Sequence, residues 1–117
     1  MTGSTPWALV VTEAEPSLSD LQLQLAEFAK RRGWDKLRTL KDVSLALGIE
    51  VGELQELLLW VPPGEEQAVI EEHREELESE AADILIYLLA LTEMADIDLL
   101  AATKAKMARN EERFPEA

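Results

Sequence analysis

Four acidic side chains lie at positions where a helical sequence would be expected to carry apolar ones. Apolar residues recur at helical spacing between positions 40 and 58, and Glu50 falls inside this stripe with Glu53 at its edge. Glu80 and Asp83 are also three residues apart, and they begin a face that continues with apolar residues. A carboxylate that faces a core is costly unless it is protonated, paired with a base or bound to a metal ion. Because Arg74 is the only Lys or Arg between positions 65 and 95, we expect a cation to bind these acids.

Two pairs of acids on facing helices would surround one cavity with four oxygen ligands. Such hard ligands suit Mg²⁺, with Mn²⁺ as the alternative, and these ions typically keep water and accept phosphate oxygens. Each acid also has a simpler interpretation, in which its flexible stem turns the carboxylate out to solvent. A di-iron site is disfavoured because it needs Glu-x-x-His motifs, and the single histidine, His73, has Ile70 three residues before it.

Helices must position these acids, and the composition favours helices. The chain has 117 residues, of which 47% are hydrophobic and 5% aromatic, so we expect one compact all-α domain. Residues 1–16 show no helical periodicity and are predicted to form a flexible N-terminal arm, with the domain at 17–117. Ser17, Thr39 and Asp98 are suited to cap helices. Four helices are predicted in an antiparallel bundle or a close variant, over 17–32, 39–60, 65–95 and 99–113.

Charge and cysteine content argue against several classes of function. The formal net charge of −13 disfavours binding to nucleic-acid polymers, although a polyphosphate could bind through bridging divalent cations. Without cysteine the chain has neither disulfides nor thiolate chemistry, and a cytoplasmic setting fits this best. The first residues lack the features of a secretory signal, and no apolar stretch reaches the ~18 residues that a membrane span needs. We therefore expect a protein that does not enter membranes.

The two acidic pairs belong to a longer ordered set of residues. The chain carries Glu50-Val51-Gly52-Glu53-Leu54 and, further on, Ser79-Glu80-Ala81-Ala82-Asp83-Ile84-Leu85-Ile86-Tyr87-Leu88. With these motifs it resembles the MazG-like all-α NTP pyrophosphatases, and among them the dCTP pyrophosphatase branch, from about Leu18 to Pro115. The resemblance implies Mg²⁺-dependent hydrolysis of a nucleoside triphosphate to the monophosphate and pyrophosphate. It favours dCTP or a modified analogue as the substrate. It assigns the Mg²⁺ ligands to Glu50, Glu53, Glu80 and Asp83, and we take Glu53 as the candidate general base.

The last predicted helix matches the family at residues that would bind phosphate. Lys106, Asn110 and Arg113 share one face of this helix, so two cations and an amide could contact phosphate oxygens. From the residues alone, a solvated face with a base near the helix C-terminus is the preferred interpretation. The assignment of these three residues as phosphate ligands therefore rests on the family resemblance.

Three aromatic residues match positions that line the base pocket in the family. These are Trp34, Trp60 and Tyr87, although from the residues alone each would be assigned to the core. The chain departs from the dCTP-directed members at two positions, since Leu25 stands where they have a histidine and Ala108 where they have an acid. These departures place dCTP only narrowly ahead of dUTP, dTTP or a broader set.

The family resemblance also implies assembly of several copies. Members are dimers or tetramers with sites between helices of different subunits, and the nearly all-apolar stretch 81–91 independently favours association. We predict a homo-oligomer, with a tetramer as the favoured state.

Two other functions remain open from the sequence. One is a non-catalytic helical oligomerisation or interaction module whose acidic surface binds a basic partner. The other is an enzyme of the same fold that acts on a different phosphoanhydride. Stabilisation by Mg²⁺ or nucleotide would separate the first from an enzyme, because binding to the folded state raises its melting temperature. A substrate panel would separate the second.

Overall fold

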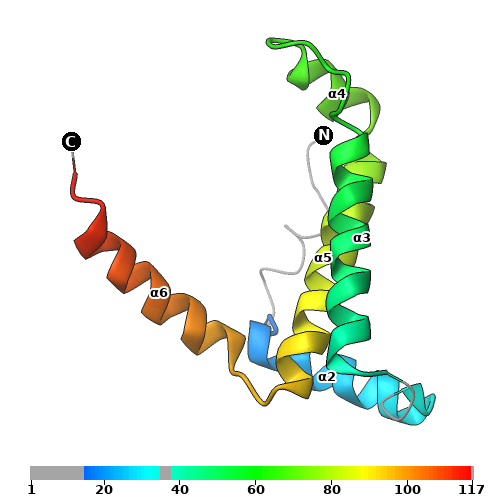
Figure 1. Cartoon of the computed structure of the whole chain (residues 1–117), viewed down its shortest axis with the longest axis vertical. Helices are drawn as coiled ribbons and strands as arrows, with labels where there is room; N and C mark the ends of the chain where they lie inside the picture. Colours follow the sequence, from blue (N-terminus) through cyan, green and yellow to red (C-terminus); the bar gives the residue numbers. More distant parts are fainter. Residues whose placement is uncertain (1–14, 35–37, 117) are drawn as a thin grey trace.

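The computed structural model describes residues 15–34 and 38–116, and within these ranges every regular element is a helix. This confirms the predicted all-α class. Residues 1–14, which make up most of the N-terminal arm predicted over 1–16, lie outside the described residues. No helix in the described residues is both long and apolar enough to cross a membrane. The helices are α2 (Leu18–Arg31), α3 (Leu40–Glu56), α4 (Glu66–Glu72), α5 (Arg74–Met94) and α6 (Leu99–Arg113), shown in Figure 1.

Local hydrogen bonds fix the start of α2 and α3 as the sequence predicts. At α2 the Asp20 N–H donates to Ser17 Oγ at 3.2 Å, and the Ser17 N–H donates to Asp20 Oδ2 at 2.9 Å. At α3 the Asp42 N–H donates to Thr39 Oγ1 at 3.1 Å. Helix α2 ends at Arg31, and Gly33 follows with a φ of 70°, a conformation that favours glycine. These signals set where the two helices begin and where the first one ends.

Helices α3 and α5 lie side by side and antiparallel, and α2 crosses one end of the pair (Figure 1). Val43 of α3 and Leu89 of α5 are the buried hydrophobic residues of this packing, with 1% and 3% of their surface exposed. Two buried polar residues tie α2 to α5, because Gln22 Nε2 donates to Thr92 Oγ1 at 2.9 Å. Gln22 Nε2 also donates to the Ile97 carbonyl at 3.0 Å, which fixes the turn after α5. These contacts pack α3 against α5 and hold α2 across one end of the pair.

Two helix boundaries differ from the prediction. The helix predicted to reach Trp60 ends at Glu56, and the N–H groups of Leu57 and Leu58 turn to carbonyls three residues back. The single helix predicted over 65–95 is divided at His73, whose φ of −118° and ψ of 29° leave the helical range. The hydrogen-bond ladder continues through this break, because the Leu77 N–H still donates to the His73 carbonyl at 2.9 Å.

Helix α6 extends away from the α3 and α5 pair (Figure 1). Asp98 caps it by accepting from the Ala101 N–H at 3.1 Å, and its main helix contact is with α2. The bounds agree with the predicted 99–113, but the fourth helix of the expected bundle does not pack along the other helices within one chain. Most of its side chains are exposed, so no continuous apolar face draws it against α3 or α5.

Candidate functional site

Three of the four predicted carboxylates converge between α3 and α5. Ligand oxygens of Glu50, Glu80 and Asp83 all lie within 4.8 Å of one another. The antiparallel pairing of the two helices produces this arrangement, because it brings the middle of α3 against the first half of α5. The spacing of three residues then turns Glu80 and Asp83 toward the same side of α5. We call Glu50, Glu80 and Asp83 the carboxylate triad.

Two oxygens of the carboxylate triad are buried and have no hydrogen-bond partner among the described residues. They are Oε2 of Glu50 and Oε2 of Glu80. Burial, with added contributions from Glu53 and Glu50, raises the pKa of Glu80 to about 7. Burial and the neighbouring Glu53 also raise the pKa of Glu50. The ion pairs among the described residues are those of His73 alone, so no base in that part of the chain neutralises the triad.

The triad therefore fits a divalent metal ion. Three carboxylates that face one another without a base repel, and two of them carry buried oxygens that no described residue pairs by a hydrogen bond. A hard cation would pair with those oxygens, and oxygen donors of this kind are the ligands that such cations prefer. The arrangement could hold a metal ion.

Glu53 lies beside the triad at the wall of an open cleft. The cleft has a volume of 530 Å³, and Glu53 lines it with Glu80 of the triad. Glu53 is exposed, yet it is near enough to raise the pKa of both Glu50 and Glu80. The structure thus places this fourth acid where the triad meets solvent. The remaining walls of the cleft carry further acids that sequence reasoning did not assign, namely Glu56, Glu75 and Glu76.

A second, mostly apolar cavity of 420 Å³ adjoins the triad. Asp83 belongs to both, because it lines this cavity together with Trp34 and Tyr87. The structure therefore brings together two of the three predicted base-binding aromatics. Trp60 is not among the residues that line the cavity; it lies in the turn after α3 with 88% of its surface exposed. Leu25 also lines the cavity.

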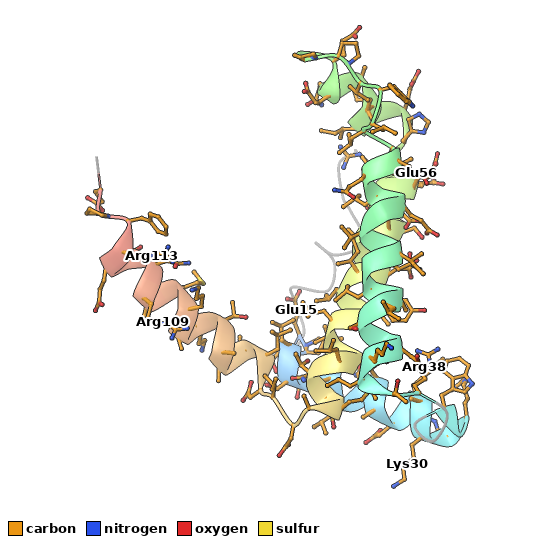
Figure 2. All side chains as sticks on the ribbon, in the orientation of Figure 1. Glu15, Lys30, Arg38, Glu56, Arg109 and Arg113 are labelled. Carbon is orange, nitrogen blue, oxygen red and sulfur yellow. The ribbon has the colours of Figure 1, made fainter. Side chains whose placement is uncertain are left out.

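The predicted phosphate-binding residues are not brought to the triad within one chain. Lys106 and Arg113 are exposed and Asn110 is partly buried. All three lie on α6, which points away from α3 and α5 (Figure 1). Figure 2 shows Arg113 near the far end of this helix. One chain therefore carries the carboxylates and these cations in separate places.

Arg38 is a residue of the apolar cavity that sequence reasoning did not assign. Its guanidinium lies 5.4 Å from the centroid of the Trp34 ring and 5.8 Å from that of Tyr87. The available signal was the concentration of six of the eleven Lys and Arg residues between positions 30 and 41. That signal marks a basic region, but it does not say which of the six side chains turns toward α5.

Comparisons with known proteins give relatives in sequence and in structure. No family model matches the chain. It is 42% identical over 104 residues to bovine (Bos taurus) dCTP pyrophosphatase 1, which covers 87% of this chain and 62% of the bovine protein. The human (Homo sapiens) dCTP pyrophosphatase 1 is 41% identical over 103 residues, covering 86% of this chain and 61% of its own length. The chain thus spans about three fifths of the length of these curated relatives.

A solved structure agrees with these relatives. The crystal structure of a pyrophosphatase from Archaeoglobus fulgidus matches with a TM-score of 0.79 and 38% sequence identity. The match covers 89% of this chain and 97% of the archaeal one. Similarity therefore extends over almost the whole of a known protein.

Proposed function

This chain belongs to the MazG-like all-α pyrophosphatases, as its motifs indicated, and we propose that it hydrolyses a nucleoside triphosphate to the monophosphate and pyrophosphate. The first candidate substrate is dCTP or a modified analogue, because the curated relatives are dCTP pyrophosphatases. The observation that carries the proposal is the pair of buried oxygens of Glu50 and Glu80, without partners in the part of the chain that the structure describes, beside a mostly apolar cavity that Asp83 lines.

The triad would hold Mg²⁺, with Mn²⁺ as the alternative, and Glu53 would complete the ligand set or accept a proton. Bound Mg²⁺ supplies neutralisation of the triphosphate charge and a more acidic water. Glu53 is the acid of the four that is open to solvent, so its carboxylate is placed to accept the proton of an attacking water. Trp34 and Tyr87 offer flat apolar surfaces on which a base can stack, one helical turn from Asp83 in the case of Tyr87.

Lys106, Asn110 and Arg113 would reach the phosphates from a second copy of the chain. Within one chain α6 points away from the triad, and among residues 15–34 and 38–116 no ion pair reaches the triad. Exposed apolar side chains on α3, such as Leu45 at 57% and Ile49 at 63%, offer a surface for association. We accordingly propose a homo-oligomer, with a tetramer as the favoured state, and we place Trp60 in the neighbour's site in the same way.

The direct test is incubation of the purified protein with a panel of (d)NTPs and Mg²⁺. Pyrophosphate and the monophosphate should appear in equal amounts, and they should disappear when the metal is chelated. Absence of pyrophosphate from every nucleotide, with no stabilisation by Mg²⁺, would instead support a non-catalytic acidic module.

A further inference from the structure

Arg38 lies near two aromatic rings in the wall of the apolar cavity. It precedes α3 and lies at the end of that helix next to α2, far from Glu56 at the other end (Figure 2). Its guanidinium is 5.4 Å from the Trp34 ring centroid and 5.8 Å from the Tyr87 ring centroid. All three residues line the same 420 Å³ cavity. The guanidinium is therefore close to any flat ligand that stacks on one of the two rings.

The guanidinium of Arg38 has donors to offer to such a ligand. Within residues 15–34 and 38–116, none of the side-chain hydrogen bonds or ion pairs uses Arg38. Arg32 differs in this respect, because it donates to the Phe28 carbonyl at 3.2 Å and lies 3.5 Å from the Phe28 ring centroid. A guanidinium carries five N–H donors and no acceptor at any working pH. The hydrogen bonds of Arg38 can therefore go only to an acceptor, such as a carbonyl or phosphate oxygen.

The place where Arg38 meets α5, at Tyr87, distinguishes between those two acceptors. Tyr87 follows Asp83 by one turn, which is about 6 Å along the helix axis. A nucleotide whose phosphates are held at the triad would extend its base toward Tyr87 and Arg38. The walls around that end are largely apolar, with Leu25, Ile86 and Met94 among them. A base fits these surroundings better than a phosphate group.

We propose that Arg38 is a specificity-determining residue that donates to a carbonyl oxygen of the base; this rests on the proposed function. Stacking on Trp34 and Tyr87 does not by itself select a base, since every base has a π face. A charged donor in a mostly apolar wall, which also carries Lys30 and Glu93, does select, because a base without an acceptor there leaves the donor unpaired. Cytosine, uracil, thymine and guanine carry a carbonyl oxygen, and adenine carries none. The site therefore prefers carbonyl-bearing bases to adenine.

The test compares kcat/KM for dCTP, dTTP, dGTP and dATP between the wild-type protein and Arg38→Met. We expect the variant to lose about 10-fold to 100-fold with the first three nucleotides, the range for a hydrogen bond to a charged donor. With dATP we expect a loss below about threefold. Arg32→Met is the matched control, because it removes the same charge beside the same aromatic group but lies outside the cavity lining. That control should leave all four values near those of the wild type.

Two further variants keep the test decisive if Arg38→Met folds poorly. Arg38→Lys keeps the charge and one donor group, and Arg38→Gln keeps an amide donor. Each should restore part of the preference for carbonyl-bearing bases. Equal losses for all four nucleotides, or no loss for any, would overturn the assignment.

Failure of the proposed function has a different signature. It would appear as a wild-type protein that hydrolyses none of the nucleotides. Isothermal titration calorimetry with dCMP and dAMP then decides the role of Arg38. Tighter binding of dCMP by the wild type, with equal binding of both by Arg38→Met, supports the role. Equal binding of both by the wild type refutes it.

Discussion

Glu50 of α3 and Glu80 of α5 meet between their two antiparallel helices, and each has one buried carboxylate oxygen that no residue of 15–34 or 38–116 pairs by a hydrogen bond. Such a contact between two acids is unfavourable when both are charged. It becomes favourable when a cation joins them. The relationship therefore links the stability of the protein to its proposed metal.

Glu50→Gln should abolish turnover without unfolding the protein. The substitution removes a ligand oxygen, so we expect activity to fall by more than about 100-fold, a loss of over ~2.7 kcal/mol of transition-state stabilisation. It also removes repulsion in the metal-free state, so the melting temperature without metal should be equal to or above that of the wild type. Pyrophosphate release and thermal denaturation measure the two effects. Glu112→Gln, on α6, is the control and should change neither. Loss of folding in Glu50→Gln would mean that this acid is structural.

The stability of the metal-free protein should fall between pH 4.5 and about 7 because of Glu80. Its pKa rises from 4.5 to about 7 in the folded state, so the folded protein binds more protons than the unfolded chain across this window. The protonated form of Glu80 is compatible with folding. Its contribution to the free energy of unfolding is fully present below pH 4.5 and is lost as the pH rises through about 7. Urea denaturation at several pH values without metal, compared with Glu80→Gln, measures the effect.

His73 contributes to the same pH dependence, so the comparison with Glu80→Gln is essential. A hydrogen bond from His73 Nδ1 to Glu76 raises the pKa of this histidine, and the stability it provides is also lost as the pH rises. Only the part of the slope that disappears in Glu80→Gln belongs to the carboxylate. An identical slope in the two proteins would contradict the assignment to Glu80.

Gln22→Ala should destabilise the protein without impairing its chemistry. The substitution removes the hydrogen bonds to Thr92 Oγ1 and the Ile97 carbonyl, and it leaves a cavity. We expect a loss of about 1–3 kcal/mol in the free energy of unfolding, measured with urea. At a temperature where the variant is folded, its kcat should match that of the wild type. A large fall in kcat would mean that the link between α2 and α5 takes part in the reaction.

Two inactive variants should restore activity to each other when they are mixed. Asp83→Asn removes a ligand of the triad, and Lys106→Ala removes a cation of α6. If α6 completes the site of a neighbouring copy, subunit exchange forms some sites with both residues intact, so activity should return to about a quarter of the wild-type value when half of the subunits are of each kind. Mixed oligomers detected by native mass spectrometry without any activity would show that the two residues serve the same chain.

The sequence predicts those parts of the fold that depend on neighbouring residues. The caps at Ser17, Thr39 and Asp98 follow from side chains that reach backbone N–H groups three residues on. The meeting of Glu50 with Glu80 and Asp83 follows from helical periodicity on two helices that pair. The general outline of the site could therefore be predicted from the sequence alone.

The other features depend on contacts that periodicity does not contain. The break at His73 lies within a sequence that otherwise favours a helix. The direction of α6 depends on the turn after Met94, where Asp96 adopts a φ of 57°. Arg38 reaches the cavity because a side chain from the segment before α3 crosses to a ring on α5. Such long-range geometry is set by packing rather than by spacing along the chain.

In the described part of the chain, Val43 and Leu89 are the hydrophobic side chains that a single copy buries, and of the two Val43 alone is fully enclosed. A core this small provides little free energy against the entropy of unfolding. If copies associate through their exposed apolar faces, part of the free energy of unfolding of each copy comes from contacts with its neighbours. Dilution alone should then lower the melting temperature. How much of the protein is made would then set how much of it is folded.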